Sequence, residues 1–358
     1  MTNFEIARDR LYHQRISAAP LNAASEVVDW LCAVQAQDYA GAKWALALRM
    51  QSATDSDLDR AFAAGDILRT HLMRPTWHFV TPADIRWMLT LTAPRVHVAN
   101  AFMYRKLELD NATLQRNNAV LADTLQGGRQ LTRDELRDAL QNAGLAPGDG
   151  LRLSYLMMSA ELDGVICSGA RRGKQFTYAL IDERAPQAKM LEREEALVEL
   201  SRRYFISRGP ATVQDFAKWS GLTIADCQRG LNAVKGQLEE RIIAGQSYWG
   251  RPSPPDQQQV SPSAYLLSIY DEYISSYKDS SAIGEAEVGA KLMALGNALT
   301  YIMVVDGQIV GNWRRTLSQD AVTIETNPFW PLTPAEDQAV AEAARRYGAF
   351  LELPVVFR

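Results

Sequence analysis

The chain has 358 residues, of which 47% are hydrophobic and 22% are charged, and its formal net charge is -4. These values exclude a disordered chain, a collagen-like repeat and a small disulfide scaffold, and the length predicts two or three folding units. The slightly acidic total also lacks the excess of lysine and arginine that is typical of nucleic-acid-binding proteins.

The cysteines and histidines do not form a metal-binding pattern. Cys32, Cys167 and Cys227 lack the CxxC spacing of a zinc site, and the four histidines form no HExxH or HxH motif. We therefore expect free thiols in a reducing cytosol, no metal and no small-molecule cofactor. The polar N-terminus has no apolar signal segment, and no stretch approaches the ~20 apolar residues of a membrane span. The expected location is the cytoplasm, in association with the nucleoid.

The first part of the chain predicts helices followed by two short strands. Val27, Leu31 and Val34 recur at i, i+4 and i+7, on one face of a helix. A break at Gln35–Gly41 precedes a second and a third helical stretch. Arg69–Val80 is rich in β-branched and aromatic residues around a central proline, which predicts a strand pair. Helices followed by a short ribbon give a winged-helix outline.

The same outline returns further along the chain. Thr132 and Glu135 form a capping-box pattern at the start of a helix, and Leu151–Asp163 predicts the next helix. Val165–Ile181 then predicts a strand, a turn and a strand. A basic tip on a hairpin that follows two helices is typical of a wing that contacts DNA. We therefore expect the cations at this tip to bind DNA: Arg171, Arg172 and Lys174.

A third copy carries a helix-turn-helix pattern. Thr212 is placed to cap a helix that Gly221 ends, and Thr223 is placed to cap the next helix. Two helices around a glycine-containing turn are the signature of this motif. Leu238–Ile243 and Gln246–Trp249 then predict its wing.

Beyond a Pro/Ser/Gln-rich linker at Gly250–Ser263, the sequence changes from a mainly helical pattern to a strand-rich pattern. Strand-like segments alternate with turns, and Asp306-Gly307 is a strong two-residue hairpin signal. Pro334–Tyr347 predicts an amphipathic helix, and Leu353–Phe357 predicts a closing strand. We expect a small β-rich module here, barrel-like or packed on the third winged unit.

The predicted fold class is therefore α+β, mainly α, with three tandem winged helix-turn-helix units and a C-terminal β-rich, barrel-like module. The expected domains are winged units at residues 1–100, 101–190 and 191–260, and the β-rich module at residues 261–358.

Gln35-Ala36-Gln37 is the most unusual polar feature of the first unit. In a regular helix, residues two apart point ~200° away from each other, so two amides that serve one site need a non-helical backbone. The break that follows, with Tyr39 and Gly41, is compatible with such a backbone. The alternative is a pair of solvated polar residues at a helix end.

Five segments together resemble one protein family. They are VQAQDYAGAKWALALR, RTHLMRPTWHFVTPADIRWML, GPATVQDFAKWSGL, YDEYISSYKD and VVDGQIVGNWRR. This set is similar to the bacterial tandem winged-helix DNA glycosylases of the AlkZ and YcaQ type, which repair alkylation and interstrand-crosslink damage. The resemblance extends from about Arg8 to Trp313. Gln35-Ala36-Gln37 resembles the Gln-apolar-Gln variant of the family's active site, found in the AlkZ-like branch, and differs from the Gln-apolar-Asp variant.

The resemblance implies a monofunctional DNA glycosylase that hydrolyses the N-glycosidic bond of alkylated purines. An N3- or N7-alkylated purine is cationic and leaves without protonation. Gln35 and Gln37 would then orient a water and stabilise an oxocarbenium-like sugar, because a neutral amide is too weak a base to ionise water. The expected partner is duplex DNA with alkylated or crosslinked purines, bound by a monomer without a cofactor or a membrane. A shallow site is expected, since crosslinked adducts do not fit a snug flipped-base pocket.

Other residues near these motifs have open roles. Asp38 is a candidate base or electrostatic stabiliser, or else it caps the following helix. Arg74, Thr76 and His78 would share one face of a strand, at the border of the site or the DNA, with Trp77 and Phe79 in the core. The alternative for His78 is a structural hydrogen bond.

The acidic pair of the YDEY segment matches the family, but no catalytic role can be assigned to it. We expect Asp271 and Glu272 to form buried hydrogen bonds to the neighbouring barrel. Lys278 is a candidate DNA contact, whereas Ser280 stands where relatives tend to have arginine, which puts a basic contact there in doubt.

Two rival functions remain open, a non-catalytic winged-helix DNA-binding protein or regulator, and a protein-interaction scaffold. The distribution of charge bears on them. Residues 1–190 contain 22 basic and 21 acidic residues, a net charge of +1, and the remainder carries -5. Because binding depends on the local field, this division predicts weak, salt-sensitive binding of DNA on one focused face.

Overall fold

The computed structural model describes residues 3–148, 150–253, 262–284, 286–294 and 301–358. Helices predominate, and the strands form four small sheets within these ranges. None of the described helices has the length and hydropathy that crossing a membrane requires.

The first group of elements contains the expected helices and strand pair. Its elements are α1 (Asn3–His13), α2 (Ala24–Leu31), β1 (Val34–Gln35), α3 (Tyr39–Ala47), α4 (Asp55–Ala64), β2 (Leu68–Leu72) and β3 (Thr76–Val80). The antiparallel order β1-β3-β2 confirms the strand pair predicted at residues 69–80. The predicted helical face that included Val34 is wrong, because Cys32 turns to a φ of 65° and ends the helix.

The second group repeats this order after a long connecting helix. Its elements are α5 (Ile85–Lys106), α6 (Asn111–Leu125), β4 (Leu131–Thr132), α7 (Arg133–Asn142), α8 (Gly150–Leu162), β5 (Ile166–Ser168), β6 (Thr177–Leu180) and α9 (Ile181–Arg184). The capping box of Thr132 and Glu135 is confirmed. The expected boundary at residue 100 falls inside α5, which continues without interruption through it.

The third group contains the helix-turn-helix. Its elements are α10 (Arg193–Arg208), α11 (Val213–Ser220), α12 (Ile224–Val234), η1 (Lys235–Gln237), β7 (Glu239–Ile243) and β8 (Gln246–Gly250). Thr212 and Thr223 cap their helices as predicted, and Gly221 ends α11 with a φ of 72°. A β-bridge from Ala211 to Trp249 takes the place of the short strand. Each group thus has the order helix, short strand or bridge, two helices, hairpin.

The C-terminal part forms one curled sheet with helices against it. Its elements are β9 (Ala264–Leu267), α13 (Glu272–Ser275), α14 (Ala286–Ala294), β10 (Ile302–Val305), β11 (Gln308–Leu317), β12 (Val322–Pro328), α15 (Pro334–Leu351) and β13 (Val355–Phe357). The order β13-β12-β11-β10-β9 has two edges, so the sheet is open and is not a closed barrel. The Asp306-Gly307 turn between β10 and β11 is confirmed. Most of the predicted linker, residues 254–261, lies outside the described residues.

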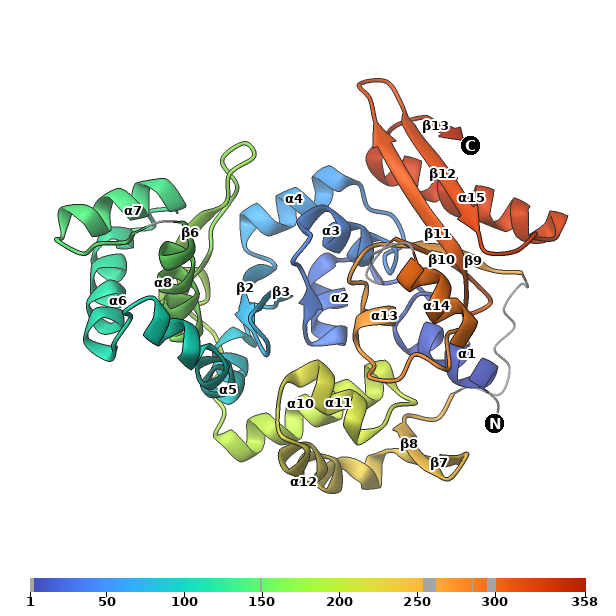
Figure 1. Cartoon of the computed structure of the whole chain (residues 1–358), viewed down its shortest axis with the longest axis horizontal. Helices are drawn as coiled ribbons and strands as arrows, with labels where there is room; N and C mark the ends of the chain where they lie inside the picture. The colour runs from blue at the N-terminus through green and yellow to red at the C-terminus, as the bar shows by residue number, and fades with distance from the viewer. Residues whose placement is uncertain (1–2, 149, 254–261, 285, 295–300) are drawn as a thin grey trace.

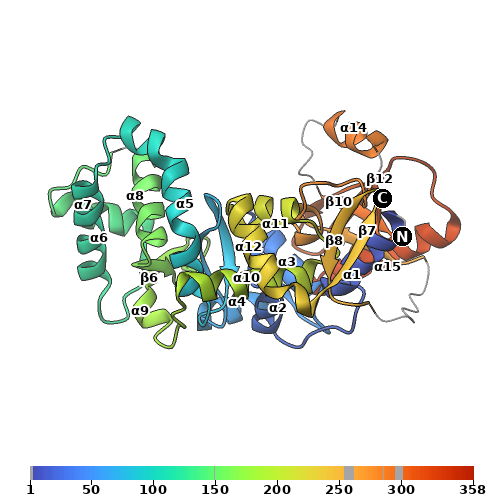
Figure 2. The same cartoon turned by 90° about the horizontal axis from the view of Figure 1, so that it is seen from below.

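The sheet packs on the first group, whereas residues 272–279 of the same C-terminal module contact α10 and α11 of the third group. The sheet and the first group contribute to one continuous apolar core. Trp44 of α3 donates from its indole nitrogen to the Leu266 carbonyl at 2.7 Å and lies edge-on to Tyr347 of α15. Figure 2 shows the resulting row of parts, with α6–α8 at one end, α10–α12 in the middle and the sheet with α15 at the other end.

Buried ion pairs join parts that are distant in sequence. Arg49, which follows α3, forms a two-point ion pair with Asp271, and both side chains are almost fully buried. Arg208 at the end of α10 donates from two nitrogens to one oxygen, Oε2, of Glu272 in α13. Asp271 and Glu272 are therefore buried and hydrogen-bonded as expected, but their ion-pair partners belong to the first and third groups, while Tyr273 donates to the Gly307 carbonyl of the sheet.

We expect Arg49→Met to lower the free energy of unfolding by about 3–5 kcal/mol, because Asp271 would remain buried without its cationic partner. Urea denaturation at neutral pH measures this loss. The matched control is Arg137→Met, which removes an exposed pair with Asp134 on α7 and should cost no more than about 1 kcal/mol. Equal losses in the two variants would contradict the role given to the buried pair.

Candidate active site

The glutamine motif begins at the end of a strand and continues into a bend. Gln35 ends β1 and pairs with His78 of β3, and the Ala36 N–H donates to the Trp77 carbonyl at 2.7 Å. Gln37 lies in the bend that follows, before α3 begins at Tyr39. The non-helical backbone predicted for the motif is confirmed, so the helical geometry that would point the two amides away from each other does not apply.

The two glutamine side chains are held by neighbouring residues of one segment. The Gln35 carbonyl oxygen accepts from Arg74 at 3.1 Å, and the Gln37 carbonyl oxygen accepts from the Trp77 N–H at 3.3 Å. Gln35 is buried and Gln37 is exposed. Both partners can only donate, which fixes the orientation of each amide. The amide nitrogens form no hydrogen bond within the described residues, so each glutamine keeps two N–H donors and one carbonyl lone pair for a ligand.

Polar atoms without a partner gather beside Gln35. Arg74 Nε, Thr76 Oγ1, His78 Nε2 and Thr70 Oγ1 are all buried and form no hydrogen bond with the described part of the chain. Thr70 and Gln35 both pair with His78, so these three residues form one row across the sheet. Buried polar groups usually have partners, so these four atoms are available to hydrogen-bond a ligand or a water.

His78 is fully buried, so its side chain is not part of the exposed surface. It pairs with Gln35 between β1 and β3, and its Nδ1–H donates to the Thr76 carbonyl at 3.0 Å. Burial, together with the nearby charge of Arg74, lowers the pKa of His78 to about 3. The ring is therefore neutral at physiological pH, with Nε2 as a bare acceptor. Of its neighbours, Phe79 lies in the core as predicted, whereas Trp77 is only half-buried.

A buried carboxylate fixes the position of the strand that carries Gln35. The Gln35 N–H donates to Glu272 Oε1 at 2.8 Å, and Glu272 Oε2 accepts from Arg208 and from the Trp219 indole. Burial alone would raise the pKa of Glu272, but the facing Arg208 holds it at about 2. Arg208 also donates to the Ala33 carbonyl at 2.9 Å. The sequence pointed to Glu272 without a role, and nothing in it pointed to Arg208.

Asp38 occupies the N-cap position of α3 but its side chain does not cap the helix. It accepts instead from the Tyr301 hydroxyl at 2.8 Å. A Cβ at Gly41 would lie 2.7 Å from Asp38 Oδ2, so glycine permits this position of the carboxylate. Asp38 therefore lies at the predicted N-cap position, but the predicted capping hydrogen bond is not formed.

The predicted wing cations lie in different surroundings. Arg171 lies 5.0 Å from the centre of the Tyr39 ring, which brings it beside the motif. Arg172 is paired with Glu135 at 2.8 Å, and its charge is partly neutralised there. Lys174 and Lys278 are exposed, and the backbone N–H of Lys278 donates to Asp215 of α11. The structure thus brings Arg74, Thr76, His78 and Arg171 to the motif, and leaves Arg172 and Lys278 apart from it.

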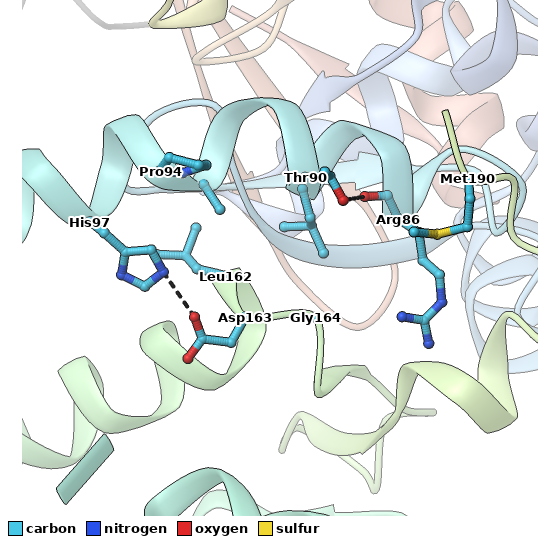
Figure 3. A pocket seen from close by; sticks show the side chains of 10 residues that line it. Arg86, Thr90, Pro94, His97, Leu162, Asp163, Gly164 and Met190 are labelled. Atoms are coloured by element: carbon cyan, nitrogen blue, oxygen red, sulfur yellow. Dashed lines mark hydrogen bonds and ion pairs between the residues drawn. The ribbon is translucent and has the colours of Figure 1, made fainter. Parts of the chain in front are cut away.

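A different cavity lies between α5 and α8 (Figure 3). It has a volume of about 260 Å³, and His97 forms an ion pair with Asp163 at 3.0 Å in its wall. Arg86 and Met190 close its other end. None of the residues predicted for the site lines it, so it does not belong to the glutamine motif.

A sequence model of a known family, described as DNA glycosylase AlkZ-like, matches residues 28–350. The chain belongs to the AlkZ-like DNA glycosylase family. The resemblance inferred from the sequence motifs is thereby confirmed. This AlkZ-like chain is also 26% identical over 370 residues to a protein of Streptomyces sahachiroi named interstrand DNA cross-link repair glycosylase, covering 97% of the chain and 96% of the relative.

The fold of the AlkZ-like chain matches a solved structure. Streptomyces sahachiroi DNA glycosylase AlkZ superimposes with a TM-score of 0.83 at 21% sequence identity, over 100% of both chains. All four groups of elements therefore belong to one shared architecture.

The neutral His78 predicts how stability depends on pH. Above about pH 6.5 His78 is neutral in both the folded and the unfolded chain, so it contributes nothing to the pH dependence of the free energy of unfolding. Below that pH the unfolded chain binds a proton that the folded chain rejects until about pH 3, so the free energy of unfolding falls by up to about 1.4 kcal/mol per pH unit. His13, whose pKa burial lowers to about 4, acts in the same direction. Urea denaturation between about pH 4.5 and 7 should give a shallower slope for His78→Asn than for the wild type, and an unchanged slope would refute this account.

Proposed function

We propose that the protein is a monofunctional DNA glycosylase that hydrolyses the N-glycosidic bond of N7- or N3-alkylated purines. The observation that carries this proposal is the pair of glutamines on non-helical backbone, each held by its carbonyl oxygen while its amide nitrogen forms no hydrogen bond with the described residues. In this proposal Gln35-Ala36-Gln37 is an active site of the Gln-apolar-Gln type. Family membership supports DNA as the substrate.

This reaction does not require a strong general base. An alkylated purine leaves as a neutral base from a cationic nucleotide, so the enzyme has to stabilise positive charge on the sugar and place a water. The remaining carbonyl lone pairs of Gln35 and Gln37 are suited to both tasks, and the N–H groups can donate to the water or to the adduct. His78 is neutral and lies behind Gln35, where it would support the amide's position and not exchange protons.

Asp38 adds the negative charge that two amides lack. Its carboxylate follows directly after Gln37 and is oriented by the Tyr301 hydroxyl. We propose that it stabilises the developing cation electrostatically, with Tyr301 as its positioning residue.

A lyase step is not part of this proposal. Lys218 of α11 is the lysine whose backbone contacts Arg74, and its ammonium donates to the Ser275 carbonyl. Burial lowers the pKa of Lys218 to about 8, but the contact with Ser275 directs the amine toward α13 and not toward the glutamines. Direct attack by water is therefore favoured over a covalent intermediate on lysine.

We further propose that the three groups of elements are tandem winged-helix units that bind duplex DNA as a monomer. The repeated order of helix, short strand or bridge, two helices and hairpin supports this. Because the relative named above carries interstrand cross-link repair in its name, crosslinked purines are the second substrate class that we propose. Exposure of Gln37 suits a shallow site that accepts bulky adducts.

The first test is release of 7-methylguanine from a methylated duplex. We expect wild-type activity and a loss of about 100-fold or more for Gln37→Ala and Gln35→Ala, because a preorganised amide contributes that much to a charged transition state. Gln51→Ala is the matched control, since Gln51 is an exposed glutamine of the same group and should keep wild-type activity. Base release is measured by chromatography and strand scission after alkali.

The rival function predicts a different result. A non-catalytic regulator would bind one DNA sequence tightly and release no alkylpurine from methylated or crosslinked duplexes. That outcome would remove the proposed activity.

Asp38→Asn separates the electrostatic role of Asp38 from a structural role. The asparagine carbonyl oxygen can still accept from the Tyr301 hydroxyl but carries no charge, so a purely structural residue would tolerate the change. We expect the single-turnover rate to fall by about 10-fold or more in Asp38→Asn, with DNA affinity nearly unchanged. Tyr301→Phe keeps the carboxylate and should lose less. A wild-type single-turnover rate in Asp38→Asn would contradict the electrostatic role and leave Asp38 with a structural role only.

A further inference from the structure

A cavity of about 330 Å³ lies beside the glutamine motif, where the β2–β3 hairpin meets the β5–β6 hairpin. Trp77, Phe176 and Tyr178 form aromatic walls, and positive charge comes from Arg69, Arg133 and Lys174. The N–H of Trp77 donates to Gln37, so one residue both lines the cavity and holds the motif. In Figure 1 the β5–β6 hairpin rises between α7 on one side and α4 on the other.

Arg69 is built into this cavity and not merely near it. Its side chain is only 7% exposed, and its guanidinium lies 4.3 Å from the Trp77 ring centre and 4.5 Å from that of Phe176. Its Nε donates to the Ala36 carbonyl at 3.0 Å. The two terminal nitrogens form no hydrogen bond or ion pair with the residues that the structure describes. They are the part of the guanidinium left for a ligand.

The charge around Arg69 calls for an anion. A buried cation is costly unless a partner neutralises it. Burial lowers the pKa of Arg69 to about 10, so the group still carries its charge at neutral pH. The nearby carboxylate of Glu161 is bonded to His71. Among the residues lining the cavity, Asp134 is the only carboxylate, and it is exposed.

We propose that this cavity binds a phosphate group of the DNA backbone next to the damaged nucleotide, with Arg69 and Lys174 as its ligands. The inference rests on the proposed function, because DNA is the ligand. Two terminal guanidinium nitrogens match two phosphate oxygens, and phosphate accepts hydrogen bonds without needing a donor in return. A phosphate bound here would fix the DNA strand relative to Gln37, since Trp77 lines the cavity and also donates to Gln37.

The test measures binding of an undamaged duplex by fluorescence anisotropy as a function of salt. Each lost phosphate contact lowers the slope of log affinity against log salt by about 0.9. We expect this decrease for Arg69→Gln and for Lys174→Ala. Between about 50 and 200 mM salt, wild-type affinity should therefore fall about 3-fold more than that of either variant. Arg69→Lys keeps the charge but not the two-point geometry, so it should keep the slope with weaker affinity.

The controls separate folding, the source of the phosphate and catalysis. Lys106→Ala removes an exposed lysine at the end of α5 and should keep the wild-type slope. Lys174 is exposed, so its variant remains informative if Arg69→Gln does not fold. An unchanged slope in Lys174→Ala and in folded Arg69→Gln overturns the proposal. The proposal is also overturned if inorganic phosphate stabilises the wild type but not Arg69→Gln, while the salt dependence of DNA binding is the same in both proteins. The site would then bind free phosphate and not the DNA backbone. Undamaged DNA requires no base release, so an inactive wild type with the expected slopes would refute the glycosylase and leave this site standing.

Discussion

The buried carboxylate of Glu272 is the constraint on which the candidate site depends. A carboxylate removed from water must find compensating partners, and Glu272 finds them in Arg208, the Trp219 indole, Ser276 and the backbone of Gln35. These partners come from the first group, the third group and the C-terminal part of the chain. The position of Gln35 is therefore a property of the assembled molecule, and no single group could produce it alone. The same reasoning applies to Arg49 and Asp271, which join α3 to the segment before α13.

The local signals in the sequence predicted local structure well. Thr132, Thr212 and Thr223 cap their helices because a hydroxyl accepts from the N–H three residues later, and that interaction needs no distant partner. Gly221 and Asp306-Gly307 end a helix and close a hairpin for equally local reasons. The non-helical backbone at Gln35-Ala36-Gln37 was predicted from chemistry, because two amides on a regular helix could not serve one site.

What the sequence could not predict depends on partners far along the chain. Val34 continues an apolar helical pattern, but pairing with Phe79 of β3 makes it a strand residue. The polar side chain of His78 suggests an exposed position on a strand, but tertiary packing buries it completely. Asp38 is an excellent cap by type, yet the Tyr301 hydroxyl takes its carboxylate. Arg208 and Arg69 gave no signal, since an arginine in a helix or a strand is ordinary until its burial is known.

The long helix α5 has a consequence for how this architecture can change. It runs without a break from the first group into the second, and the second group carries the hairpin that meets the glutamine motif. Inserting one residue into a helix rotates everything beyond it by about 100° and advances it by about 1.5 Å. Such an insertion would turn the β5–β6 hairpin away from Trp77 and separate Phe176 from Arg69. The length of α5, including the bend expected at Pro94, therefore sets the alignment of the two halves of the surface.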